Sequence, residues 1–240
     1  MQSKHLFIAT AIANTILTPV FAQNNPHFEI ISAAAMPLKA PPGEGGKVSL
    51  NIMTTAVNGS LHAKDPKKHA DFRRTLEIAL SSAIERPDTE QRSKRPPSAV
   101  KDITKLQIAF TPKKLATNQQ LLVASPAGML TSNGWSGLER FVSISGVGQY
   151  KLTEFDLTKT GGKFFLSSDA VNANVDNVPA GAKSFLDDDG DIVEEVVWVS
   201  GGRFHMLTFL PETMATALKG QKEKRAPSTS AISIAQAFRE

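Results

Sequence analysis

Two neighbouring segments near the carboxyl end, residues 192–199 (IVEEVVWV) and 204–210 (FHMLTFL), constrain the fold more than any other part of the chain. In both segments, each of the two alternating sets of side chains is largely apolar. A strand with one face in water alternates apolar and polar residues, so these two strands are expected to lie centrally in a sheet covered on both faces. A C-terminal helix, a second sheet layer, a ligand or another chain would provide the second cover.

The segments that precede these two predict an antiparallel sheet. From residue 103 onward, short strand-like runs are separated by Gly, Pro, Asn or Asp, and the connections are short enough for hairpins. No helical run of ten or more residues interrupts them, which disfavours a parallel sheet. The preceding runs are 103–110, 119–125, 138–145, 149–157, 162–168 and 182–186. The connections include NGWSG (133–137) and PAGA (179–182).

One main helix is predicted over residues 65–86. Asp65 suits its N-cap, Pro66 suits its first position, and apolar residues then recur at spacings of three and four until Pro87. We therefore expect an α+β fold in which an antiparallel β-meander packs against this amphipathic helix.

The last segment, residues 219–240, is predicted to be a basic tether followed by a short C-terminal helix, with Ser228 or Ser230 as the N-cap. The inner stripe of that helix would consist of Ile232, Ala235 and Phe238. Residues 86–98 hold no apolar side chain other than prolines, which predicts an exposed linker. We place this linker inside a single α+β domain that spans residues 23–218.

The first 22 residues have the pattern of a secretory signal peptide. Lys4 precedes a short apolar run that ends in Val20-Phe21-Ala22, a small-residue cleavage pattern. A retained anchor is the alternative, but the run is shorter than the roughly 20 strongly apolar residues of a spanning helix. The chain has no cysteine, whereas small secreted animal domains usually depend on disulfides. We therefore expect a bacterial protein that is periplasmic or secreted.

The acidic segment Asp187-Asp188-Asp189-Gly190-Asp191 has two interpretations. If Gly190 takes the sixth position of a helix–loop–helix calcium loop, Phe185 takes the first, where an oxygen ligand is needed. An Asp-Gly pair between two strands is instead typical of a hairpin turn. We predict a turn, with a divalent-ion site as the alternative.

The residues best placed to bind a ligand or partner are Trp135, Trp198, Arg203 and His205. An arginine, a histidine and tryptophans beside glycine turns are typical of the rim of a pocket or interface. The chain contains no nucleophile elbow, metalloprotease, phosphate-binding or dinucleotide-binding motif. No catalytic residue, metal ligand or cofactor is therefore assigned.

The predicted function is a non-catalytic binding or protein-interaction module in the periplasm, acting on an unknown protein or small ligand. The alternative is a periplasmic hydrolase that uses His205 with Glu154 or Asp156, which share one strand face, although strand carboxylates are ordinarily exposed. No nucleic-acid partner is expected, because the net charge of +4 is mild. No membrane span is expected after signal cleavage. The sequence does not decide between a monomer and a homo-oligomer.

Overall fold

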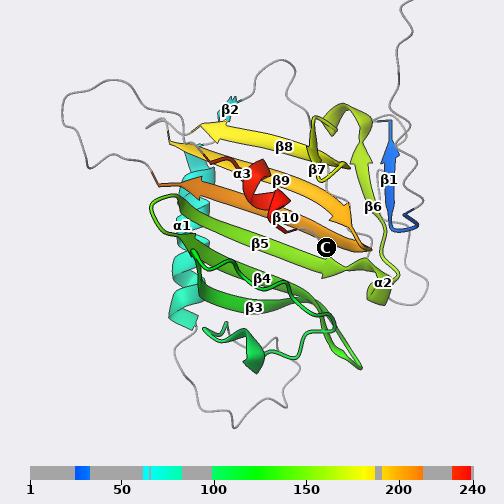
Figure 1. Ribbon diagram of the computed structural model, residues 1–240, viewed down its shortest axis with the longest axis horizontal. Helices are drawn as coiled ribbons and strands as arrows, with labels where there is room; N and C mark the ends of the chain where they lie inside the picture. Colours follow the sequence, from blue (N-terminus) through cyan, green and yellow to red (C-terminus); the bar gives the residue numbers. More distant parts are fainter. Residues whose placement is uncertain are drawn as a thin grey trace, which may run out of the picture.

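The computed structural model describes residues 25–32, 62–64, 66–82, 99–186, 191–212 and 229–238 (Figure 1). The strands are β1 (Phe28–Ile31), β2 (His62–Lys64), β3 (Gln119–Thr131), β4 (Gly134–Ile144), β5 (Gly148–Asp156), β6 (Phe164–Ser167), β7 (Ala173–Val175), β8 (Val178–Leu186), β9 (Ile192–Ser200) and β10 (Arg203–Pro211). The helices are α1 (Pro66–Ser82), α2 (Leu157–Thr160) and α3 (Ala231–Gln236), with 3-10 turns at Ile103–Lys105 and Ser168–Ala170.

Most of these strands belong to one large sheet with the order β2-β8-β9-β10-β5-β4-β3, in which β7 also pairs with β8. It consists of two antiparallel meanders, β3-β4-β5 and β8-β9-β10, that join where β10 pairs with β5. Among the described strands of this sheet, only the three-residue β2 pairs in parallel, with β8. The α+β class and the antiparallel sheet are therefore confirmed.

The two segments with apolar side chains on both faces are β9 and β10, and both lie inside the sheet, each with a neighbour on either side. On the first face, helix α1 covers one end through Phe72 and Leu76, which pack against Phe141, Val193 and Leu210. The other end of the first face is covered by the small sheet of β1 and β6, which forms a second cluster. This cluster contains Phe28, Phe164, Leu166, Val197, Val199 and Phe204.

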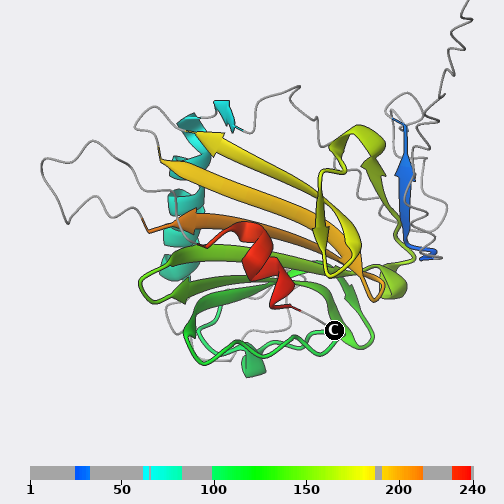
Figure 2. The ribbon, with the colours of Figure 1, turned by 45° about the horizontal axis from the view of Figure 1, so that its top comes forward.

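The second face is covered by α3, which lies across the sheet on the side opposite α1 (Figure 2). Its side chains join a buried cluster with Val142, Tyr150, Leu152, Val196, Trp198, Leu207 and Phe209. The predicted short C-terminal helix therefore exists, with Ser230 as its N-cap. Four covers were considered from the sequence: a C-terminal helix, a second sheet layer, a ligand or another chain. Where α3 packs on the second face, the cover is the C-terminal helix.

Two predicted strands differ in the structure. Residues 103–110 are not a strand: the Asp102 side chain accepts a hydrogen bond from the Thr104 amide and starts a 3-10 turn, and one bridge then joins Ile108 to Trp135. The second is β6, which leaves the large sheet and pairs in parallel with β1. Phe28 stacks on Phe164 there, with ring centroids 6.0 Å apart, so apolar packing fixes this pairing.

Two predicted connections are strand instead. NGWSG contributes only the end of a two-residue turn, and its Trp135 lies within β4. PAGA lies within β8. Their glycines mark close packing: a Cβ on Gly137 would lie 2.5 Å from the Phe155 ring, and one on Gly181 would lie 3.1 Å from the Ala170 carbonyl oxygen.

Several predictions lie outside the described residues. These are the signal peptide (1–22), the linker (86–98), the acidic turn apart from Asp191, and the basic tether (219–228). The helix predicted over 65–86 is confirmed where it is described, from Pro66 to Ser82.

Both edges of the large sheet are blocked at several described positions. On β8, strand β7 pairs at one end and β2 at the other, while the Asn172 side-chain amide bonds both the N–H and the C=O of Ala182 between them. On β3, Val100 exchanges two backbone hydrogen bonds with Ala124, and Pro126 has no N–H to donate. Additional strands are therefore hindered from pairing at either edge.

Candidate functional site

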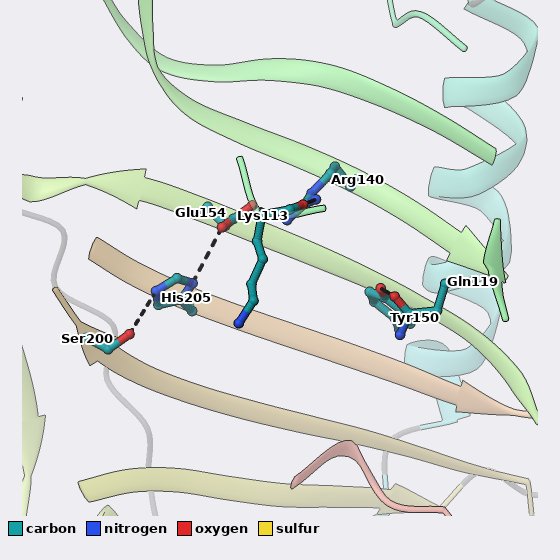
Figure 3. Close-up of polar contacts among 7 residues, drawn as sticks. All are labelled: Lys113, Gln119, Arg140, Tyr150, Glu154, Ser200 and His205. Atoms are coloured by element: carbon teal, nitrogen blue, oxygen red, sulfur yellow. Dashed lines mark hydrogen bonds and ion pairs between the residues drawn. The ribbon is translucent and has the colours of Figure 1, made fainter. Parts of the chain in front are cut away.

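A row of buried polar side chains crosses the second face of the sheet from β4 through β5 to β10 (Figure 3). Glu154 lies directly opposite His205 in the ladder of β5 and β10, and Arg140 reaches Glu154 from β4. Arg140 Nη2 lies 2.6 Å from Glu154 Oε2, and both side chains are only 2% exposed. His205 Nδ1 lies 3.8 Å from the other carboxylate oxygen, Oε1. The expectation that strand carboxylates are exposed is therefore wrong for Glu154.

Two residues of β9 hold the imidazole of His205 in place. Its Nε2 lies 3.2 Å from the hydroxyl oxygen of Ser200. The ring of Trp198 stacks on the imidazole with centroids 4.7 Å apart and planes 10° apart. When Nδ1 carries the proton, Nε2 accepts the hydrogen bond from Ser200. The spatial order Ser200–His205–Glu154 is that of a serine–histidine–acid chain.

Burial and the charges around His205 keep it neutral. Burial, followed by the positive charges of Arg203, Arg140 and Lys113 in that order, lowers the pKa of His205 to about 3. Arg140 is also anchored on the segment that precedes β3, because its Nη1 donates a 2.7 Å hydrogen bond to the Lys113 carbonyl. Among the described residues, Arg140 Nε and His205 Nδ1 are buried without a hydrogen-bond partner.

A half-buried rim adjoins this row at the same end of the sheet. The Arg203 guanidinium lies 5.1 Å from the centroid of the Phe110 ring. The segment that carries Phe110 runs beside the start of β4: Trp135 N–H donates to the Gln107 carbonyl, and Ala109 N–H donates to the Trp135 carbonyl, both at 2.8 Å. This segment therefore links Trp135 to Arg203.

The four residues predicted to bind a partner thus lie towards the same end of the sheet, but the contacts described above do not join all four of them. Trp198 and His205 touch each other and are buried, at 1% and 3% exposure. Arg203 lies two residues before His205 on β10 and is half-buried. Trp135 is also half-buried, and its backbone is hydrogen-bonded to the segment of residues 107–110, which carries Phe110.

The other predicted carboxylate, Asp156, is buried as well, and it caps a helix. Its Oδ1 accepts hydrogen bonds from the backbone N–H of Thr158 and Lys159 and from the Thr158 hydroxyl, which starts α2. Of the two carboxylates considered for His205, Glu154 is therefore the one that faces it.

Sequence reasoning missed Arg140 and Ser200. Arg140 carried a usable signal, because it lies between Leu138 and Val142 at a spacing of two residues and so shares their apolar face. A buried arginine requires a buried carboxylate nearby. Ser200 carried no such signal, since a serine before two glycines is also an ordinary turn residue.

A shallow polar hollow of about 350 Å³ lies near the opposite end of β4. It is lined by Thr117, Asn118, Gln119, Gln120, Ser143 and Ser145. These side chains are hydroxyls and amides without a titratable group, so the hollow offers no acid–base pair. The described residues also contain no group of three or more histidines and carboxylates arranged to hold a metal ion.

Comparison with protein-family models, with curated proteins and with solved structures found no match. In the described ranges, no helix has both the length and the apolar character needed to cross a membrane.

Proposed function

We propose that this chain is an exported bacterial protein that acts in the periplasm as a non-catalytic binding or protein-interaction module. The observation that carries this proposal is the half-buried contact of Arg203 with Phe110 at one end of the sheet, where the segment that carries Phe110 is hydrogen-bonded to the backbone of Trp135. Arginine and aromatic side chains contribute most of the energy in many protein interfaces, and a rim of this kind provides them on a rigid support.

The buried row beneath this rim supports the same proposal. The ionisable groups Arg140, Glu154 and His205 are each at most 3% exposed, so they position the rim rather than contact a partner directly. In this proposal Trp198 and His205 support the site from below without touching the partner, and Trp135 and Arg203 form the rim that does. The partner is a periplasmic protein or small ligand.

Replacing a rim residue is expected to weaken partner capture by about tenfold or more, the effect of losing about 1.4 kcal/mol of binding energy. The test compares wild-type protein, Arg203→Ala and Trp135→Ala as bait in periplasmic extracts and quantifies each captured species. Ile78→Ala is the matched control, because Ile78 is 57% exposed on α1, at the other face of the sheet. Equal capture by all four proteins contradicts the proposal, provided that the variants unfold at the same urea concentration as wild type.

Hydrolysis is a second candidate function, and one observation favours it. Ser200, His205 and Glu154 follow one another in the order of a nucleophile, a base and an orienting acid, at 3.2 Å and 3.8 Å. Against it stands the pKa of His205, which burial and the nearby positive charges lower to about 3, because a base this weak removes a proton poorly at neutral pH.

An activated aryl ester distinguishes the two candidates. If the protein is a hydrolase, it releases the aryl alcohol at a steady rate, and Ser200→Ala abolishes that rate because the nucleophile is removed. On the binding proposal, wild type and Ser200→Ala show the same background rate. A serine-dependent rate at least tenfold above background would replace the binding proposal with the hydrolase.

A further inference from the structure

Helix α3 is a small cover for a large apolar face. It has six residues, and a helix this short is not stable by itself, so it forms only because it packs on the sheet. Its packing side chains are Ala231, Ile234 and Ala235, followed by Phe238 just beyond its end. Leu115, Leu121, Val147 and Val178 border the same cluster and are only partly buried. The apolar face therefore extends beyond the area that α3 covers.

Few specific contacts hold α3 in place. The Ala231 N–H donates a 2.6 Å hydrogen bond to Glu194 Oε2 at the amino end of the helix. At its other end, the Phe238 ring meets Tyr150 edge-on at 5.9 Å and lies 5.8 Å from the Arg140 guanidinium. The capping box of Ser230 and Ser233 stabilises the helix through hydrogen bonds within its own first turn. Apolar contact and one carboxylate thus define how a helix sits here.

The connection to α3 is much longer than its placement requires. Glu194, which holds the first residue of α3, pairs with Phe209, only three residues before Glu212. The gap is therefore on the order of 15 Å, given a rise of about 3.3 Å per residue and one side chain. Residues 213–228 lie between, and a chain of that length reaches up to about 55 Å when extended. The sequence therefore allows α3 to leave the face while it stays tethered.

We infer that α3 is a displaceable cover and that the face beneath it is the docking site for an amphipathic helix of a partner protein. This inference rests on the proposed binding function and names the kind of partner. The partner helix carries the stripe that α3 displays: small, branched aliphatic, small and aromatic residues at positions i, i+3, i+4 and i+7. Its amino end lies at Glu194, since a carboxylate favours the N-terminus of a helix.

A longer helix can displace α3 because it buries more of the same face. The tether gives α3 an effective concentration in the millimolar range, which a competitor has to overcome. A helix of three or four turns with the same stripe also covers Leu115, Val147 or Val178 at the border, which α3 leaves partly exposed. Trp198 lies in this face and also contacts His205. A partner helix docked on this face would therefore lie next to the binding site proposed above.

The test uses the full mature chain and a fluorescently labelled peptide that repeats the α3 stripe over four turns. Gln236→Gly loosens α3 without removing a contact, because Gln236 is exposed and glycine is a poor helix former. We expect this variant to bind the peptide about fivefold more tightly than wild type, measured by fluorescence anisotropy. Ser230→Ala, which removes the cap, is expected to act in the same direction. A peptide with aspartate at the aromatic position is the control and is expected not to bind.

Two results of the peptide assay would overturn the inference: no binding of the peptide to any variant at millimolar concentration, or equal binding to wild type and both loosened variants. Hydrogen exchange on wild-type protein gives an independent reading, in which the amides of Ile234 and Ala235 exchange at least a hundredfold faster than those of β9. Equal protection of α3 and β9 would show that α3 does not leave the face. If the peptide fails but the rim variants still lose their captured partner, the inference is wrong and the proposed binding function stands.

Discussion

Glu154→Gln is expected to lower the free energy of unfolding by about 3–5 kcal/mol, because it leaves the guanidinium of Arg140 buried without its counter-charge. The pair lies 2.6 Å apart with both side chains 2% exposed, so water cannot replace the lost carboxylate. Urea denaturation of the mature protein, followed by tryptophan fluorescence, measures the change. Trp198 is a suitable reporter because it is buried and stacks on His205, which lies opposite Glu154.

Glu139→Gln is the matched control for this prediction. Glu139 lies 4.0 Å from Lys151 on the neighbouring strand, but the two side chains are 33% and 21% exposed. Solvent-exposed pairs of this kind contribute at most about 1 kcal/mol. Equal losses in the two variants would mean that Arg140 finds another partner, and the account of the buried row would then be wrong.

The free energy of unfolding is also expected to fall as the pH is lowered from about 6.5 towards 3. The folded-state pKa of His205 is about 3, below its unfolded value of 6.5, so the unfolded state takes up the proton first. The stability due to neutral His205 is therefore complete above pH 6.5 and is lost as the pH falls. The full loss amounts to about 4–5 kcal/mol, and about 2–3 kcal/mol of it occurs between pH 7 and 4.5.

The measurement compares urea midpoints at pH 7 and 4.5 for wild type and His205→Gln. Glutamine keeps a donor and an acceptor near Ser200 but does not titrate. The charged groups around the imidazole are Arg203, Arg140, Lys113 and Glu154, and they are the same in both proteins. The variant is expected to lose less stability than wild type over this interval. Identical pH dependence in the two proteins would show that His205 does not titrate as described.

The placement of β9 and β10 could be predicted because their side chains left no polar face to expose. The main helix could be predicted because it has a capped start and regular apolar spacing. Residues 103–110 were wrongly predicted as strand, since the hydrogen bond of the Asp102 side chain competes with extended structure there. The glycines of NGWSG and PAGA were read as turns, although they fit against Phe155 and Ala170 in strands.

The candidate site was predictable only in part. The contact of Trp198 with His205 follows from two neighbouring strands that share a hairpin, so the sequence favours it. The pairing of Arg140 with Glu154 depends on how β4, β5 and β10 align, and local patterns do not fix that register. The sequence left four alternatives for the cover that α3 provides. The local sequence pattern does not distinguish a helix of the same chain from a partner's helix.

The blocked edges of the large sheet have a consequence for behaviour at high concentration. An open strand is a template on which another molecule can be added, and repeated addition produces fibres. In this protein the side-chain amide of Asn172 occupies backbone hydrogen-bonding groups at one edge of the sheet, and Pro126 lacks an N–H to donate at the other edge. Concentrated solutions are therefore expected to stay clear and free of amyloid-type growth.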